Sequence, residues 1–200
     1  MSAYSVVLPE SASDWRLPSR GRVGMWCLIG AESAIFTIFV VAYLFYIGKS
    51  TSGPQPGDVL HAPIFYTVCL LASSATIHLA VRRLAANELG AFGRWWLATI
   101  LLGGSFLFGT AREWMHLIYG EGLTVSTNLF GTTYYSLVGL HAFHVTMGLL
   151  ALTMVAMFYF TSRLRREHAP RLEVLSMYWH FVDAVWVVVF TVVYVIGVSR

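Results

Sequence analysis

The stretch Tyr178-Trp179-His180-Phe181-Val182-Asp183-Ala184-Val185-Trp186 lies within an apolar run that extends from Ser176 to Val198. This run is long enough to cross a bilayer as an α-helix, which requires about 20 residues. His180 and Asp183 are three residues apart, so they share one face of that helix. Ionisable groups inside a membrane are costly, and they usually face protein or water and often mark a function. The stretch therefore predicts a membrane helix that carries a buried polar pair.

The whole chain is rich in such runs. Its 200 residues are 57% hydrophobic and its mean hydropathy is +0.66, which exceeds what a soluble surface tolerates. We predict an all-α, polytopic membrane protein with a cytoplasmic tail at residues 1–22 and one transmembrane domain at residues 23–200. The five predicted helices of this domain cover residues 23–47, 62–81, 95–117, 130–160 and 176–198. The polar first 18 residues do not have the pattern of a signal peptide.

Basic residues predict how the bundle is oriented, because Lys and Arg accumulate on the cytoplasmic side of a membrane. On one side of the membrane, the only Lys and Arg residues outside the predicted helices are Lys49, in the first connection, and Arg200, at the C-terminus. Ten arginines belong to the tail and to the second and fourth connections on the other side: Arg16, Arg20, Arg22, Arg82, Arg83, Arg94, Arg163, Arg165, Arg166 and Arg171. This distribution predicts that the N-terminus is inside and the C-terminus outside. The net charge of +3 thus reports membrane orientation, and no nucleic-acid-binding module is visible.

Glu32 lies about nine residues into the first predicted helix, or ~14 Å from the inner boundary of the membrane. One interpretation is a neutral glutamic acid that is hydrogen-bonded within the bundle. The other is a site for a lipid, a proton or a partner subunit. On the same depth scale Asp183 lies near the level of Glu32, and His144 lies somewhat further out.

His141 and His144 are also three residues apart, so their imidazoles can converge on one metal ion. A structural zinc site needs four ligands and a catalytic site usually three. The others would have to come from His180, Asp183 or Glu32 on other helices. Buried, hydrogen-bonded histidines are therefore favoured over a metal or haem site.

The pair of His180 and Asp183 can share a proton or form an ion pair, and either arrangement removes an isolated charge from lipid. A structural pair is favoured over a catalytic dyad, because no Ser or Cys nucleophile lies in a recognisable turn.

A second polar cluster, Arg112, Glu113 and His116, lies at the outer end of the third predicted helix. Consecutive Arg and Glu point in different directions, so we expect them to contact other helices, loops or headgroups. Trp114 beside them is typical of an interfacial anchor.

Four motifs carry a resemblance to a known family. The segment Phe130-Gly131-Thr132-Thr133-Tyr134-Tyr135, followed by Gly139-Leu140-His141-Ala142-Phe143-His144-Val145 and Gly148, resembles the penultimate helix of subunit III of the haem-copper oxidases. The opening stretch is similar to the final helix of that family. Arg22-x-Gly24-Met25 with Glu32 resembles its glutamate-bearing helix, and Glu113-Trp114 resembles its Glu-aromatic pair. The resemblance covers all five helices in order and matches the short form of the family, which lacks the first two helices of longer members.

This resemblance implies an accessory subunit III of a cytochrome c or quinol oxidase in the bacterial cytoplasmic (inner) membrane. Such a subunit is not catalytic alone and has no catalytic, cofactor-binding or metal-binding residues, since haem and copper belong to its partner subunits. It packs on subunit I, with subunit II and small subunits as further partners, and it binds phospholipid. It sustains proton uptake while the complex reduces O2 to water and pumps protons. The motif positions assign five residues to its polar interior: Glu32, His141, His144, His180 and Asp183.

Three alternatives remain at this point. One is a subunit III homologue associated with a nitric oxide reductase. Another is a stand-alone membrane metalloprotein that uses His141, His144 and His180. The third is a proton or solute transporter that uses Glu32 and Asp183. The electron donor, cytochrome c or a quinol, depends on sites in other subunits.

Overall fold

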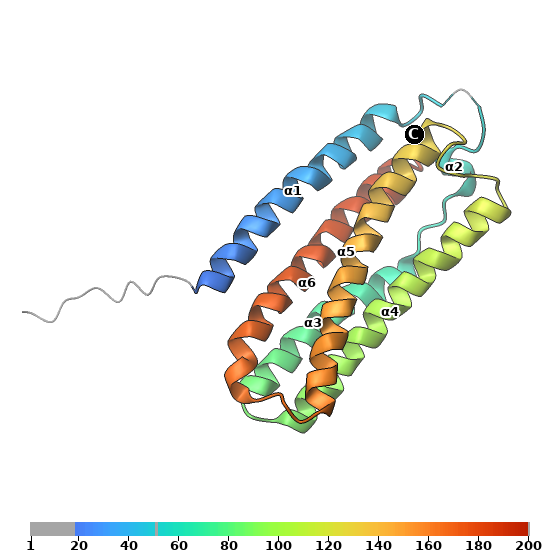
Figure 1. Cartoon of the computed structure of the whole chain (residues 1–200). Coiled ribbons are helices and arrows are strands. Elements are labelled where there is room, and N and C mark those ends of the chain that lie inside the picture. The colour runs from blue at the N-terminus through green and yellow to red at the C-terminus, as the bar shows by residue number, and fades with distance from the viewer. Residues whose placement is uncertain (1–18, 51, 200) are drawn as a thin grey trace, which may run out of the picture.

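Long helices form a bundle in the computed structural model, which describes residues 19–50 and 52–199 (Figure 1). Five helical segments are long and apolar enough to cross a membrane. Four of them are α1 (Arg20–Tyr46), α3 (Ile64–Ala85), α4 (Leu89–Tyr119) and α5 (Leu129–Phe160). The fifth is continuous through the 3-10 turn η1 (Arg166–His168), α6 (Ala169–Phe190) and the π-helical segment η2 (Thr191–Ile196). The prediction of an all-α protein with five membrane-spanning helices is confirmed.

The helices extend beyond the apolar runs that predicted them. The last one begins ten residues before the predicted start at 176, with Pro170 in the first turn of α6, where its missing N–H costs nothing. α4 begins at Leu89 and not at residue 95, and α3 continues to Ala85 with two arginines in its last turn. Hydropathy marks where lipid ends, and a helix can continue into water. The predicted irregular loop at 48–61 also contains a short helix, α2 (Pro56–Val59).

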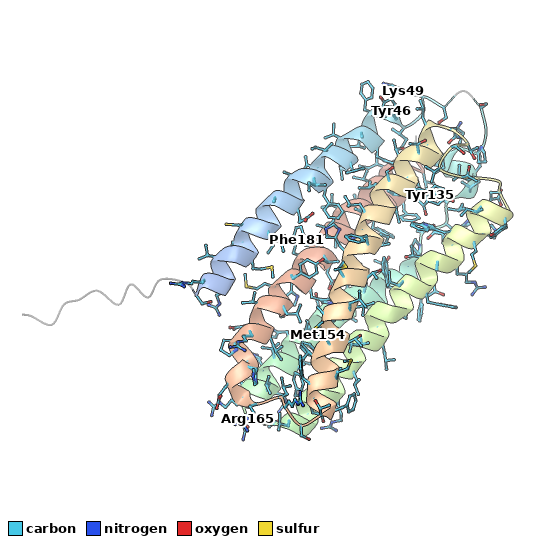
Figure 2. The ribbon with its side chains drawn as sticks, in the orientation of Figure 1. Tyr46, Lys49, Tyr135, Met154, Arg165 and Phe181 are labelled. Atoms are coloured by element: carbon cyan, nitrogen blue, oxygen red, sulfur yellow. The ribbon has the colours of Figure 1, made fainter. Side chains whose placement is uncertain are left out.

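α3 and α4 form an antiparallel hairpin whose connection includes Asn87 in a left-handed conformation, with a φ of 63°. α6 packs against α3 and α5, and α1 packs against α5 and α6. In Figure 1, α1 and α4 form opposite edges of the bundle. Figure 2 shows Arg165 near the α5–α6 connection and Lys49 at the opposite end of the bundle.

Close helix contacts depend on glycine around Trp179 of α6, which is fully buried. A Cβ atom on Gly103 of α4 would lie 2.9 Å from the Trp179 ring, and one on Gly148 of α5 would lie 2.8 Å from it. The indole therefore occupies space that two neighbouring helices leave free. Small residues of this kind allow membrane helices to pack without a hydrophobic driving force.

Large apolar side chains cover much of the outer surface of the bundle. Trp26 and Ile38 of α1, Leu101 of α4, and Phe143 and Met154 of α5 are all exposed. A soluble protein of this size would not expose so much apolar surface, whereas lipid or partner helices can cover it.

Candidate functional site

The polar interior begins where α1 meets α5. Oε2 of Glu32 lies 3.1 Å from Nε2 of His144, and both side chains are largely withdrawn from solvent, at 21% and 8% exposure. The depth estimate placed His144 further out than Glu32, but the two side chains meet. The depth of a side chain in the membrane also depends on helix tilt and on side-chain length, and an estimate from residue numbers along the helix includes neither.

The hydrogen bonds of His144 determine how many protons the pair holds. Nδ1 lies 2.8 Å from the carbonyl oxygen of Leu140, which can only accept, so Nδ1 carries a hydrogen. The contact between Nε2 and Glu32 then needs one further proton, located either on the imidazole or on the carboxyl. The pair is therefore neutral as a whole in both arrangements, which is the state that a membrane interior favours.

His141 has a different environment, although it lies one turn away. Its ring stacks on Trp186 with centroids 4.9 Å apart, and it makes edge contacts with Phe106 and Phe36. It is fully buried, and neither ring nitrogen has a hydrogen-bond partner among the described residues. The expectation of a hydrogen-bonded histidine is wrong at this position within the described residues, since aromatic rings of three other helices pack against the imidazole.

The pair of His180 and Asp183 is bridged by a residue of another helix. Ser74 of α3 hydrogen-bonds to Oδ2 of Asp183, and its Oγ lies 2.9 Å from Nδ1 of His180. Ser176 Oγ lies 3.1 Å from Nε2 of the same imidazole. No direct His180–Asp183 bond occurs among the described contacts, so the predicted pair exists only through Ser74. Both side chains turn toward α3, where hydroxyl groups are available.

These contacts indicate the proton arrangement of the bridge. A serine hydroxyl has one hydrogen, and Ser74 donates it to the Asp183 carboxylate. Ser74 therefore accepts from Nδ1–H of His180, and Nε2 accepts from Ser176. The arrangement resembles the members of a hydrolytic triad in residue type only. The serine contacts the carboxylate directly, and no imidazole nitrogen is free to remove its proton.

The outer polar cluster lies beside a cavity of about 410 Å³, which Arg112, Glu113 and His116 line together with His61. Oε1 of Glu113 also accepts hydrogen bonds from Tyr194 at 2.8 Å and from Tyr134 at 3.3 Å, so this carboxylate joins α4, α5 and η2. Glu113 therefore contacts other helices, as expected, and lies next to Arg112 and His116 at the wall of one cavity.

Sequence reasoning missed the hydroxyl partners. Ser73 accepts from Nε1 of Trp179 at 2.8 Å and Ser74 forms the bridge, but neither residue belongs to a motif of the sequence analysis. Tyr134 belongs to a quoted motif, but nothing in the sequence indicated that it reaches Glu113. A hydroxyl next to an ionisable residue on a neighbouring helix is a contact that only the fold specifies.

A metal site would need these histidines together. The described part of the chain has no group of three or more His, Cys, Asp or Glu residues that could hold a metal ion. His141, His144 and His180 instead contact aromatic rings, a carboxyl and two serines, respectively. The donor set on which the metalloprotein alternative depended is therefore not assembled within residues 19–50 and 52–199.

Fold and site together define a multi-pass α-helical membrane protein whose interior polar groups bond to one another across helices. Comparison with known proteins narrows this class. Residues 21–198 match the family described as cytochrome c oxidase subunit III, and the chain belongs to that family.

Proteins similar to this chain include third subunits of cytochrome c oxidases and of a ubiquinol oxidase. Cytochrome c oxidase subunit 3 of Alkalihalophilus pseudofirmus is 35% identical over 179 residues, which cover 88% of this chain and 87% of that protein. Cytochrome c oxidase subunit 3 of Bacillus subtilis is 32% identical and covers 94% of this chain and 93% of its own length. Cytochrome bo(3) ubiquinol oxidase subunit 3 of Pseudomonas aeruginosa is 33% identical and covers 87% and 84%, respectively.

Proposed function

We propose that this chain is the non-catalytic subunit III of a bacterial terminal oxidase, packed on the haem-copper subunit I and in contact with subunit II. The observation that carries the proposal is the family match over residues 21–198, which includes all five membrane helices. The interior contacts support it, because Glu32, His144, His180 and Asp183 each form a hydrogen bond with another side chain of the bundle. Relatives of both donor types occur, so the proposal covers cytochrome c and quinol oxidases.

The same proposal assigns a role to the Glu32–His144 pair in phospholipid binding and sustained proton uptake. Two features support this role. The pair contains one proton that can reside on either partner, and part of the Glu32 side chain remains exposed. Movement of this proton between the two partners leaves the pair neutral, and a proton passed on to a lipid headgroup or a neighbouring subunit has to be replaced for the pair to become neutral again.

The orientation is also part of the proposal: the N-terminus lies in the cytoplasm and the C-terminus outside, in the inner membrane. Arg83, Arg165 and Arg171 belong to the end of the bundle that carries the α3–α4 and α5–α6 connections, as Figure 1 shows. The two connections at the other end contain Lys49 and no arginine. By the positive-inside rule, the end of the bundle with the excess of arginine is the cytoplasmic one.

Purification through an affinity tag on this chain, from native membranes in mild detergent, tests the proposal. We expect a haem-bearing subunit I to co-purify in equal amount, and the complex to reduce O2. Recovery of the chain without any haem protein would contradict it. Nitric oxide reduction without O2 reduction would favour the nitric-oxide-reductase alternative, and stoichiometric metal on the separated chain would favour a metalloprotein.

A further inference from the structure

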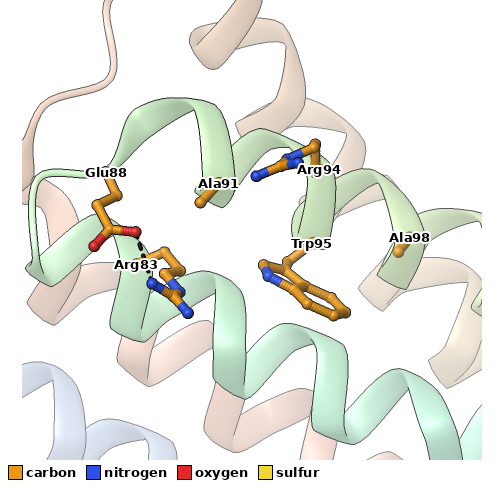
Figure 3. Close-up of a pocket in the computed structure, with 6 residues that line it drawn as sticks. All are labelled: Arg83, Glu88, Ala91, Arg94, Trp95 and Ala98. Atoms are coloured by element: carbon orange, nitrogen blue, oxygen red, sulfur yellow. Dashed lines mark hydrogen bonds and ion pairs between the residues drawn. The ribbon is translucent and has the colours of Figure 1, made fainter.

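A cavity at the basic end of the bundle lies between the last turn of α3 and the first turns of α4. Its volume is about 480 Å³, and Figure 3 shows the six side chains that line it: Arg83, Glu88, Ala91, Arg94, Trp95 and Ala98. Ala91 and Ala98 lie on either side of Trp95 along α4, and their small side chains leave the space open. The Glu32–His144 pair instead joins α1 to α5, and α1 lies at the opposite edge of the bundle from α4 (Figure 1).

The charges around this cavity have both signs. Nη1 of Arg83 donates to Oε2 of Glu88 at 2.8 Å, and about half of each side chain remains exposed. A guanidinium has five N–H donors, so most donors of Arg83 remain available for another acceptor. Arg94 lines the same cavity and makes no ion pair within the described part of the chain. The cavity thus offers two cations and one anion.

The helix end adds to the positive character. Glu88 is the N-cap residue of α4, but its side chain bonds to Arg83 and caps no backbone N–H. The first N–H groups of a helix carry partial positive charge. In Figure 3 the indole nitrogen of Trp95 points toward the side of the cavity where Arg83 and Glu88 lie. Trp95 thus adds an N–H donor on the side of the cavity where Arg83 lies.

An apolar surface continues from the cavity toward the middle of the membrane. Ala98, Leu101, Ser105 and Phe108 follow one another at helical spacing on α4, and Leu101 and Phe108 are 72% and 64% exposed. Trp95 at the polar end is typical of the level at which lipid headgroups meet acyl chains. A ligand that fits both parts has a charged head and a long apolar tail.

We propose that this cavity binds one zwitterionic aminophospholipid of the phosphatidylethanolamine type. Its phosphate contacts Arg83 and Arg94, its ammonium group contacts the free oxygen of Glu88, and an acyl chain follows Leu101 and Phe108. Basic cavities between helices on the cytoplasmic side are suited to lipid headgroups. Glu88 is the feature that selects an amine, since it would repel a headgroup with only negative charge. The site requires only that the chain spans a membrane, so it does not depend on the oxidase proposal.

The test counts lipids on the complex that the tagged chain forms in native membranes. The purified complex is incubated with deuterated phosphatidylethanolamine or deuterated phosphatidylglycerol and is purified again, and retained deuterated lipid is measured by mass spectrometry. We expect the unmodified protein to retain one more phosphatidylethanolamine than the double variant Arg83→Gln/Arg94→Gln. Loss of these charge-assisted bonds corresponds to about tenfold weaker binding or more.

Three further variants separate a binding role from a structural one. Ala98→Phe fills the cavity without changing any charge, and we expect the same loss of one lipid. Arg165→Gln removes an exposed arginine of the same end outside the cavity, and we expect full retention. Glu88→Gln should remove the preference for phosphatidylethanolamine over phosphatidylglycerol. Equal retention by the unmodified protein and both cavity variants, or equal retention of the two lipids by the unmodified protein, would overturn the proposal.

Discussion

Glu32 and His144 share one proton, so replacement of the Glu32 carboxyl by an amide tests what this proton does. In Glu32→Gln the amide N–H can donate to Nε2 of a neutral imidazole, so the contact between α1 and α5 persists. The amide cannot take up or release a proton. We therefore expect normal assembly of the complex but a severalfold faster loss of activity over repeated turnovers, measured by oxygen consumption.

Glu32→Leu is the matched control for this substitution. It leaves Nε2 of His144 without its partner, which costs about 1 to 3 kcal/mol, so we expect reduced thermal stability as well. If Glu32→Gln retains activity as long as the unmodified complex, the proton in this pair has no role in turnover.

Ser74 carries a prediction of its own, because it is the residue on which the His180–Asp183 bridge depends. Ser74→Ala would leave Oδ2 of Asp183 unpaired, and Oδ1 already has no partner among the described residues. A buried acceptor that is left without its hydrogen bond costs about 1 to 3 kcal/mol, and more when it is charged. We expect a large loss of assembled complex, measured as yield and as melting temperature.

The control is Ser105→Ala, since the Ser105 hydroxyl donates to the Leu102 carbonyl of its own helix at 2.7 Å. We expect a change within about 0.5 kcal/mol. Similar melting temperatures for the two variants would show that the bridge contributes little.

α4 and α5 pack closely on α6 because Gly103 and Gly148 have no Cβ atom where they meet Trp179. In Gly148→Ala the new Cβ would lie 2.8 Å from the Trp179 ring, which cannot move without breaking the bond from Nε1 to Ser73. Overpacking of this kind costs about 1 to 3 kcal/mol. We expect a lower melting temperature and altered tryptophan fluorescence.

Gly104→Ala provides the comparison, because a Cβ atom on Gly104 of α4 would have no neighbour within 4 Å among the described residues. Alanine is favoured over glycine in a helix interior by about 0.5 to 1 kcal/mol. We expect this variant to be as stable as the unmodified protein or slightly more stable. A destabilised Gly104→Ala would mean that this face is covered in the complex.

The five helices were predictable because a membrane imposes one strong requirement, a long apolar run. Their ends were not, since the turn that begins with Pro170 contains Arg171 and Glu173 and is still helical. The residues of the polar interior were predictable as ionisable groups in lipid. Their partners were not, because contacts such as Ser74 with Asp183 join positions 109 residues apart, and local spacing contains no information about them.

The whole bundle has an orientation that chemical labelling can determine. With Cys27 and Cys69 replaced by alanine, we expect Glu121→Cys to react with a membrane-impermeant maleimide in intact cells. Glu167→Cys should react only after the membrane is made permeable, because it belongs to the α5–α6 connection. The opposite pattern would reverse the orientation inferred from the arginines.

The attachment of α1 has a consequence for the order of events during synthesis. Its two polar links, Glu32 with His144 and Arg22 with Glu173, join residues 112 and 151 positions apart. α1 leaves the ribosome before both of its partners, since α5 and α6 lie further along the chain. We therefore expect α1 to enter the bilayer without these contacts and to be secured only when α5 and α6 arrive.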